Sequence, residues 1–233
     1  MYVYLIGAGP GDPGLITLKG LHALQRADVI VYDFLSSEEL LAHARPDAEL
    51  IYVGKKAGNH ALPQPEINRL LVRLAKEGKT VARLKGGDPY IFGRGGEEGE
   101  ELFDAGVPFE EIPGISSTIA GPAYAGIPLT HRSLASSVTL ITGHEDPTKP
   151  GSVHDLNALA RGASTLVFVM GMKNLPEISR NLISAGMPAE TPAALVHWGT
   201  TDHQRSLAST IGELPEDAVR EGAHALFYPH GLG

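Results

Sequence analysis

Short apolar runs alternate, over the first half of the chain, with segments whose apolar residues have helical spacing. The runs at 2–6, 28–32, 49–53 and 80–84 predict β-strands, because they are short and rich in Val, Ile, Leu and Tyr. Strands that alternate with helices favour a mostly parallel sheet with helices on both faces. The first half is therefore expected to form an α/β domain.

The segments between these strands carry helix start and stop signals. Thr17 is placed to cap a helix over 18–26, and Ser36 with Glu39 has the spacing of a capping box for the next helix. A third helix is expected to end at Gly78. Its apolar positions recur at i, i+3, i+4 and i+7, as Ile67, Leu70, Leu71 and Leu74.

The segment Ile112-Pro113-Gly114-Ile115 is the best candidate for a domain boundary. An Ala/Gly-rich stretch at 116–126 follows it, and then strands are predicted near 137–142, 164–169 and 191–197, with helices near 152–160 and 174–185. The stretch 204–228 has the pattern strand, helix, strand. We therefore expect an α/β fold in two domains, 1–113 and 114–233.

Composition narrows the classes of function. Lys and Arg number 19 against 27 Asp and Glu, a net charge of −8 without any basic run, so nucleic acid is not an expected partner. No apolar run approaches the roughly 20 residues that cross a bilayer, and no basic segment precedes an apolar stretch at the N-terminus. A cytoplasmic protein without a membrane partner is expected. The chain has no Cys, no HExxH motif and no His pair at metal spacing, so we expect no metal.

The loop GAGPGDPG, residues 7–14, follows the first strand and contains Gly9-x-Gly11-x-x-Gly14, with Asp33 further on. This is the fingerprint of a dinucleotide site, and an NAD-dependent dehydrogenase is one hypothesis. Pro10 and a second proline in the loop argue against it, because proline has no N–H to offer a pyrophosphate. A turn that binds no ligand is the simpler interpretation of this loop alone.

A second loop follows the strand at 80–84 and reads KGGDPYIFGRGGEE, residues 85–98. Paired glycines at the carboxyl end of a strand allow a ligand to approach the backbone, and open α/β sheets bind ligands at those ends. The carboxylate of Asp88 is suited to ligand hydroxyl or amino groups. With two such loops after strands of one sheet, a ligand site becomes the better interpretation.

The segments GAGPGDPGLITLKG, VYD, VGK, RLKGGDPYIFGRGGEE and AGIPLTHR occur in this order. Over nearly the whole chain they resemble the tetrapyrrole methylases, and GRGGEE resembles the members that act on uroporphyrinogen III. The resemblance implies a homodimer of two-domain chains that bind S-adenosylmethionine (SAM) in a cleft between the domains. It implies methylation of uroporphyrinogen III at carbons 2 and 7, giving precorrin-2 by way of precorrin-1 for sirohaem or cobalamin, with S-adenosylhomocysteine as the other product.

The resemblance also implies roles for individual residues. Those matching the SAM site are Pro10, Gly86, Gly87, Asp88, Ile91, Ser116, Ser117, Met170 and Gly199. Ser116-Ser117 replaces the usual Thr-Ala, and His197-Trp198 stands where relatives often have Glu-Asn. The C-terminal segment at 227–230 departs from the family as well.

Asp33 of VYD matches the family's proton acceptor and Lys55 of VGK its proton donor. From the residues alone, Asp33 could equally cap the helix after it, and Lys55 could be a solvated loop lysine. The eight carboxylates of the implied substrate need cationic partners, and our candidates on motif loops are Lys56, Arg94 and Arg132. The alternative for each is a surface ion pair.

Two other interpretations of the resemblance remain open. A related methylase would act on a later corrinoid precursor, and a regulatory protein would bind SAM without catalysis. The presence of both Asp33 and Lys55 argues against the second, since a protein that only senses SAM needs neither.

Overall fold

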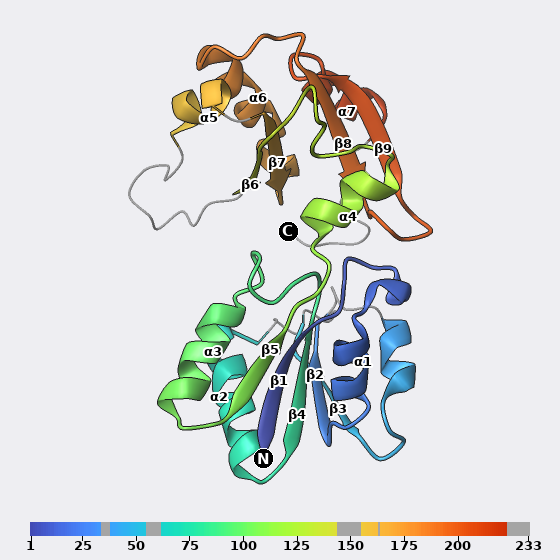
Figure 1. Cartoon of the computed structure of the whole chain (residues 1–233), viewed down its shortest axis with the longest axis vertical. Helices are drawn as coiled ribbons and strands as arrows, with labels where there is room; N and C mark the ends of the chain where they lie inside the picture. The colour runs from blue at the N-terminus through green and yellow to red at the C-terminus, as the bar shows by residue number, and fades with distance from the viewer. Residues whose placement is uncertain (34–37, 55–61, 144–154, 163, 223–233) are drawn as a thin grey trace. The chain divides into compact units, whose positions relative to one another are not determined.

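The computed structural model describes residues 1–33, 38–54, 62–143, 155–162 and 164–222. The chain divides into two compact units, Met1–Ala120 and Gly121–Gly233, and each contains both strands and helices (Figure 1). The α/β fold class is therefore confirmed. The division between the units falls within helix α4 (Ser117–Tyr124), in the Ala/Gly-rich stretch that follows the predicted boundary at residue 114.

Unit 1 contains a five-stranded sheet in the order β3-β2-β4-β1-β5, in which all neighbouring strands are parallel. The four predicted strands are confirmed as β1 (Tyr2–Gly7), β2 (Val29–Tyr32), β3 (Glu49–Tyr52) and β4 (Thr80–Lys85). The edge strand β5 (Phe109–Ile112) was not predicted from sequence, because its two central glutamates break the apolar pattern. Since the strands are parallel, the loops after them emerge at one edge.

The helices of unit 1 begin and end largely where the sequence indicates. Thr17 caps α1 (Leu18–Leu24) by accepting a hydrogen bond from the Gly20 amide at 3.1 Å, and α2 (Gln64–Lys76) ends before Gly78. The described residues of unit 1 also form two 3-10 helices, η1 (Pro13–Leu15) and η2 (Glu38–His43). The predicted cap Ser36 lies outside the described residues. Helix α3 (Gly95–Asp104) corrects the expectation that 85–98 is all loop.

Successive residues along each strand point to opposite sides of the sheet, and each side has its own apolar core. Helices α2 and α3 cover one face and α1 covers the other (Figure 1). The first face buries Val3, Leu5, Val29, Val31, Val81 and Leu102, among others. The second buries Ile6, Leu24, Ile30, Leu40, Leu84 and Ile112, among others. The apolar alternation thus fixes which face each strand residue occupies.

The described part of unit 2 contains two two-stranded sheets. β6 (Val138–Thr142) and β7 (Thr165–Val169) are parallel, and β8 (Pro192–His197) and β9 (Arg205–Thr210) are antiparallel. The helices are α5 (Leu156–Gly162), η3 (Met172–Asn174), α6 (Leu175–Ser184) and α7 (Leu214–Arg220). The strand predicted after α7 and the start of the helix predicted at 152 lie outside the described residues. Within the described ranges, no helix is both long and apolar enough to cross a membrane.

Candidate active site at the carboxyl edge of the parallel sheet

The order of the strands creates a switch point between β1 and β4. The chain leaves β1 for β2, on the far side of β4, and leaves β4 for β5, on the far side of β1. The loops after β1 and β4 therefore diverge to opposite faces of the sheet. In open α/β sheets this is where ligands bind, just outside the carboxyl ends of the strands.

The two glycine loops at this point are hydrogen-bonded to each other. The amide of Gly87 donates to the carbonyl of Gly9 at 2.7 Å, and the amide of Gly9 donates to the carbonyl of Gly87 at 3.2 Å. Both glycines have positive φ, +83° at Gly9 and +68° at Gly87, a conformation that side chains rarely adopt. Two loops that are almost eighty residues apart in sequence thus form one surface.

The segment after β5 closes against these loops. A Cβ on Gly114 would lie 2.2 Å from the carbonyl oxygen of Gly87 and 2.7 Å from Cα of Gly7, so only glycine fits there. A Cβ on Gly87 would lie 3.8 Å from Cα of Ser116 and 4.0 Å from the amide nitrogen of Ser117. The structure therefore brings together the Gly86–Gly87 loop and the predicted Ser116 and Ser117.

Ser116 is buried, and its hydroxyl accepts hydrogen bonds from the amide and the hydroxyl of Thr118, at 3.3 and 2.9 Å. Its carbonyl accepts from the amides of Ile119 and Ala120. Ser116 thus caps the N-terminus of α4, while Ser117 is exposed at the first turn.

Asp88 is nearly buried, and both oxygens of its carboxylate bind main-chain amides. Oδ1 accepts from Tyr90 at 2.9 Å and from Ile91 at 3.0 Å, and Oδ2 accepts from Gly114 at 3.1 Å. The loop that follows is held in a turn which leaves the side chain of Ile91 exposed. Asp88 therefore shapes the loop through the backbone, a contribution that its motif alone did not indicate.

The first loop is built differently from a pyrophosphate cradle. Asp12 accepts a hydrogen bond from the Gly14 amide at 2.7 Å, and α1 begins only after Thr17. No helix starts at the second glycine of the pattern, where a dinucleotide fold would place its pyrophosphate. Pro10 lies in this loop, directly after the Gly9 that pairs with Gly87.

Asp33 follows β2 at the same edge of the sheet. Its Oδ2 accepts a hydrogen bond from Nη2 of Arg83, 2.9 Å away, and a quarter of its side chain is exposed. Arg83, Lys85 and Glu98 form a buried charged cluster behind it. Burial lowers the pKa of Lys85, and repulsion by Arg83 lowers it further, against the attraction of Glu98.

Sequence reasoning missed this cluster. The signal that was present is the alternation of Arg83 and Lys85 with apolar residues in a strand that is otherwise typical of a sheet centre. Glu98 is the last residue of the GRGGEE segment that carries the family resemblance, but the prediction of a loop there gave no reason to expect its side chain to be buried.

The predicted substrate-binding residues lie in different parts of the chain. Arg94, at the start of α3, has a φ of +59° and binds Glu97 through two hydrogen bonds, at 2.8 and 2.7 Å. The hydrogen bond from Arg94 lowers the pKa of Glu97. Arg132 belongs to unit 2 and is exposed in the turn at 131–135. Lys55 and Lys56 lie outside the described residues.

Met170 and Gly199 follow two strand ends of unit 2. Met170 has a φ of +57° and a largely exposed side chain directly after β7. Gly199 follows Trp198, whose φ is +50°, and a Cβ on Gly199 would lie 2.9 Å from Cα of Gly121. Residues held in such strained conformations concentrate at ligand sites. The unusual His197-Trp198 pair is in edge-to-face contact, and burial lowers the pKa of His197.

Residues 2–215 match the family of Tetrapyrrole (Corrin/Porphyrin) Methylases. The chain belongs to this family. The Gly9-x-Gly11-x-x-Gly14 pattern is thus part of a tetrapyrrole methylase loop, in agreement with the late start of α1.

Two curated relatives within the family are more than half identical to this tetrapyrrole methylase in sequence. It is 52% identical over 219 residues to a uroporphyrinogen-III C-methyltransferase of Bacillus subtilis, with 94% of this chain and 85% of the relative covered. It is 54% identical over 224 residues to a siroheme synthase of Pseudomonas entomophila. That alignment covers 96% of this chain and 48% of the relative, so the chain spans about half of the siroheme synthase.

A solved structure shares both sequence and fold. It is the uroporphyrin-III C-methyl transferase of Thermus thermophilus in complex with S-adenosylhomocysteine, at 40% identity and a TM-score of 0.79. The match covers 93% of this chain and 86% of that one.

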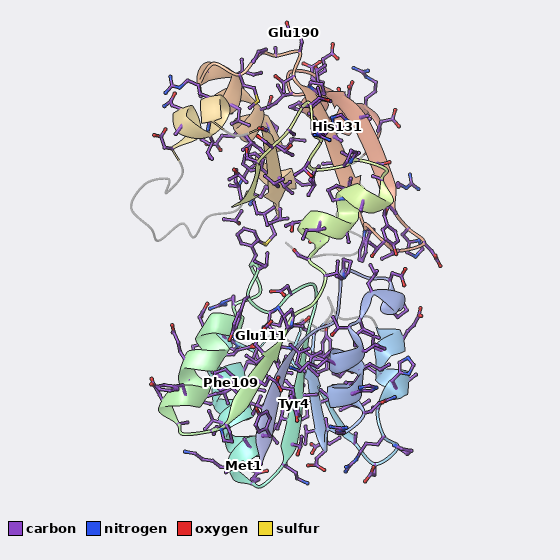
Figure 2. All side chains as sticks on the ribbon, viewed as in Figure 1. Met1, Tyr4, Phe109, Glu111, His131 and Glu190 are labelled. Atoms are coloured by element: carbon purple, nitrogen blue, oxygen red, sulfur yellow. The ribbon has the colours of Figure 1, made fainter. Side chains whose placement is uncertain are left out.

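A cavity of about 310 Å³ in this tetrapyrrole methylase lies away from the carboxyl edge, between α1 and the strands β1 and β5. Tyr4, labelled in Figure 2, lines it together with Ile112 and the ion pair of Lys19 and Glu110. Among the predicted site residues that the structure describes, none lines this cavity. In the described part of the chain, no three His, Asp or Glu side chains gather as metal ligands would.

Proposed function

We propose that this protein is a SAM-dependent C-methyltransferase that methylates uroporphyrinogen III at carbons 2 and 7, giving precorrin-2 by way of precorrin-1 for sirohaem or cobalamin biosynthesis. The observation that carries the proposal is the similarity to a uroporphyrinogen-III C-methyltransferase, at 52% identity over 94% of the chain. The paired glycine loops at the sheet's switch point support it, because they form the expected kind of ligand surface.

The residues at the carboxyl edge fit SAM. Gly87 has no side chain, and this leaves space beside its backbone. A Cβ atom built there would be in van der Waals contact with Ser116 and Ser117, so any side chain would occupy that space. We propose that Pro10, Gly86, Gly87, Asp88, Ile91, Ser116 and Ser117 bind SAM there, Asp88 through the loop that it shapes. Met170 and Gly199 of unit 2 are proposed to contact the adenine, which would make residues 114–233 the part that completes the SAM site.

The sulfonium of SAM supplies an electrophilic methyl group, whose bond to sulfur breaks as the bond to a pyrrole carbon forms, leaving S-adenosylhomocysteine. The methylated ring is cationic until a neighbouring meso carbon loses a proton. We propose that Asp33 accepts this proton, since its carboxylate is partly exposed at the same edge as the glycine loops. From the family resemblance, Lys55 is proposed as the group that returns a proton to the tetrapyrrole. Holding the two reactants in contact is expected to supply much of the rate.

The substrate's carboxylates are proposed to bind Arg94, Arg132 and Lys56. The Arg94–Glu97 pair is exposed, and such pairs contribute little stability, so a substrate carboxylate can replace Glu97 at small cost. The planar guanidinium then offers the same two-pronged contact to the substrate.

Mass spectrometry of the product formed anaerobically from uroporphyrinogen III and excess SAM tests the proposal. A gain of two methyl groups is expected, and the Asp33→Asn variant should lose most of it. No gain by a protein that still binds S-adenosylhomocysteine would overturn the proposal and favour a later corrinoid as substrate.

We also propose a cytoplasmic homodimer, as the family resemblance implies, without a nucleic-acid or membrane partner. The net charge of −8 supports the absence of a nucleic-acid partner. Light scattering coupled to size-exclusion chromatography should give twice the chain mass of 24.7 kDa, and a monomer would contradict the dimer.

A further inference from the structure

We propose that Arg83 is a positioning residue for Asp33, and that Glu98 anchors Arg83 in that task. The inference rests on the proposed function, because it assumes that Asp33 accepts the proton. It adds two buried residues, on β4 and α3, which lie at the two ends of the RLKGGDPYIFGRGGEE segment but were given no role in the reaction by the resemblance.

Strand register places Arg83 and Asp33 on the same face of the sheet. Arg83 pairs with Val31 across the β2–β4 ladder, and side chains two residues apart on a strand share a face. Asp33 therefore follows Val31 on the side of the sheet where the side chain of Arg83 lies. From there Nη2 of Arg83 reaches Oδ2 of Asp33 at 2.9 Å.

The guanidinium of Arg83 is held at every nitrogen. Nε donates to Oε1 of Glu98 at 3.1 Å, and Nη1 donates to the carbonyls of Leu84, at 3.1 Å, and Val31, at 3.4 Å. Only 3% of the side chain is exposed. Because hydrogen bonds at Nε and Nη1 fix the orientation of the planar guanidinium, the N–H of Nη2 that reaches Asp33 has a fixed direction.

Glu98 fixes this arrangement from the helix. Its side chain is fully buried, and Oε1 accepts hydrogen bonds from Arg83, from Lys85 at 2.9 Å and from Gln64 at 3.1 Å. Oε2 of Glu98 has no hydrogen-bond partner among the described residues, so Oε1 carries all three bonds. The two buried cations need two anions, and Asp33 is the second, partly exposed one.

Proton transfer depends on where the acceptor oxygen points. A carboxylate that turns about its own bonds loses the hydrogen-bond distance that transfer requires, and misplacement by about 1 Å can cost about 100-fold in rate. Arg83 holds one oxygen of Asp33 in place and so fixes the direction of the whole carboxylate.

A second Arg–Asp pair, at the other end of β2, is a control for the effect of an Arg→Lys change away from the proposed site. It has the same length, but its arginine is more exposed and also binds Asp47. Asp28 directly precedes β2, and its Oδ1 accepts from Nη2 of Arg45, also at 2.9 Å. An Arg45→Lys variant alters an Arg–Asp pair of the same length at the opposite end of β2, away from the carboxyl edge. Neither Arg45 nor Asp28 belongs to the proposed active site.

The experiment compares Arg83→Lys, Glu98→Gln and Arg45→Lys, each alone and with Asp33→Asn, by kcat, both KM values, the Kd for S-adenosylhomocysteine, and Tm. Arg83→Lys should lower kcat by about tenfold or more and leave that Kd within about twofold. In the Asp33→Asn background it should cause no further loss of kcat, because the group it positions is gone. Arg45→Lys should leave kcat unchanged in both backgrounds.

An equal loss of kcat from Arg83→Lys with and without Asp33→Asn would overturn the inference, as would a loss that only parallels the fall in Tm. If Arg83→Lys does not fold, Glu98→Gln decides by the same comparison, since it keeps the volume of the side chain and one acceptor oxygen. If the wild type transfers no methyl group, the proposed function itself fails, and this is seen before any variant is made.

Discussion

The carboxylate of Asp88 joins two loops of unit 1, because its Oδ2 accepts a hydrogen bond from the amide of Gly114 at 3.1 Å. Its Oδ1 meanwhile holds the turn at Tyr90 and Ile91. One side chain thus links the loop after β4 to the segment after β5, across the loop after β1. The neighbouring Glu111, labelled in Figure 2, is affected as well, since burial and then repulsion by Asp88 raise its pKa.

Asp88→Asn should lower the free energy of unfolding by about 1–3 kcal/mol, because an amide nitrogen cannot accept the hydrogen bond that one carboxylate oxygen accepts now. The affinity for S-adenosylhomocysteine should fall too, as the loop bearing Ile91 loosens. Urea unfolding and calorimetric titration measure the two effects. The control is Asp104→Asn, at an exposed position at the end of α3. An unchanged affinity despite lost stability would show that the loop does not bind the ligand.

Gly114→Ala should destabilise unit 1 by at least about 2 kcal/mol, because the new Cβ would meet the backbone of Gly87 and Gly7 at distances where neither can yield. Gly96→Ala is the matched control: no heavy atom lies within 4 Å of its Cβ position, and alanine favours the helix. The control should be neutral or slightly stabilising. Comparable losses of stability in the two variants would refute the close-packing argument.

Asp28 should make the free energy of unfolding decrease at acidic pH. The hydrogen bond from the Thr80 amide, at 2.7 Å, and the charge of Arg45 lower its pKa below the unfolded value of about 3.9. A carboxyl whose pKa is lower in the folded state stabilises it fully above the unfolded pKa, and this contribution disappears as pH falls through the folded pKa. Asp28→Asn should therefore be less stable at neutral pH and lose less stability between about pH 5 and pH 2. Urea titrations over this range measure it, and parallel curves for the two proteins would count against the assignment.

Arg94→Ala should raise the KM for uroporphyrinogen III by about tenfold and the KM for SAM by less than about twofold, because a two-pronged contact to a substrate carboxylate is lost. Steady-state kinetics measure both. Arg73→Ala is the control, since Arg73 forms a similarly exposed ion pair with Glu77, at 3.2 Å on α2. Equal increases in both KM values would rule out a role specific to the tetrapyrrole.

Trp198 is the single tryptophan of the chain, so its fluorescence reports on one place. It is more than a third exposed and directly precedes Gly199, the proposed adenine contact. S-adenosylhomocysteine should therefore quench or shift the emission, whereas NAD should leave it unchanged. If the Trp198 emission stays unchanged at S-adenosylhomocysteine concentrations where calorimetry shows saturation, the adenine does not bind beside Trp198.

The elements that sequence predicted correctly are those whose signals are local. Apolar runs identified β1 to β4, Thr17 marked the start of α1, and Gly78 marked the end of α2. Strand β5 and helix α3 were missed for a local reason as well. Glutamates interrupt the apolar pattern of β5, and glycines at the start of α3 read as loop. Both elements form because they pack on strands that are distant in sequence.

By itself, the sequence determined the α/β class, the two glycine loops and the family resemblance, since each is written in contiguous residues. Only the tertiary structure decided that Gly9 pairs with Gly87, that Gly114 packs on both loops, and that Arg83 links Asp33 to Glu98. The alternation along β4 places Arg83 on one face of the sheet, but it does not indicate which residues bind Arg83 there. They are set by which strand lies next to β4 and by the position of Glu98 on α3, and both follow from burying the apolar cores on the two sides of the sheet.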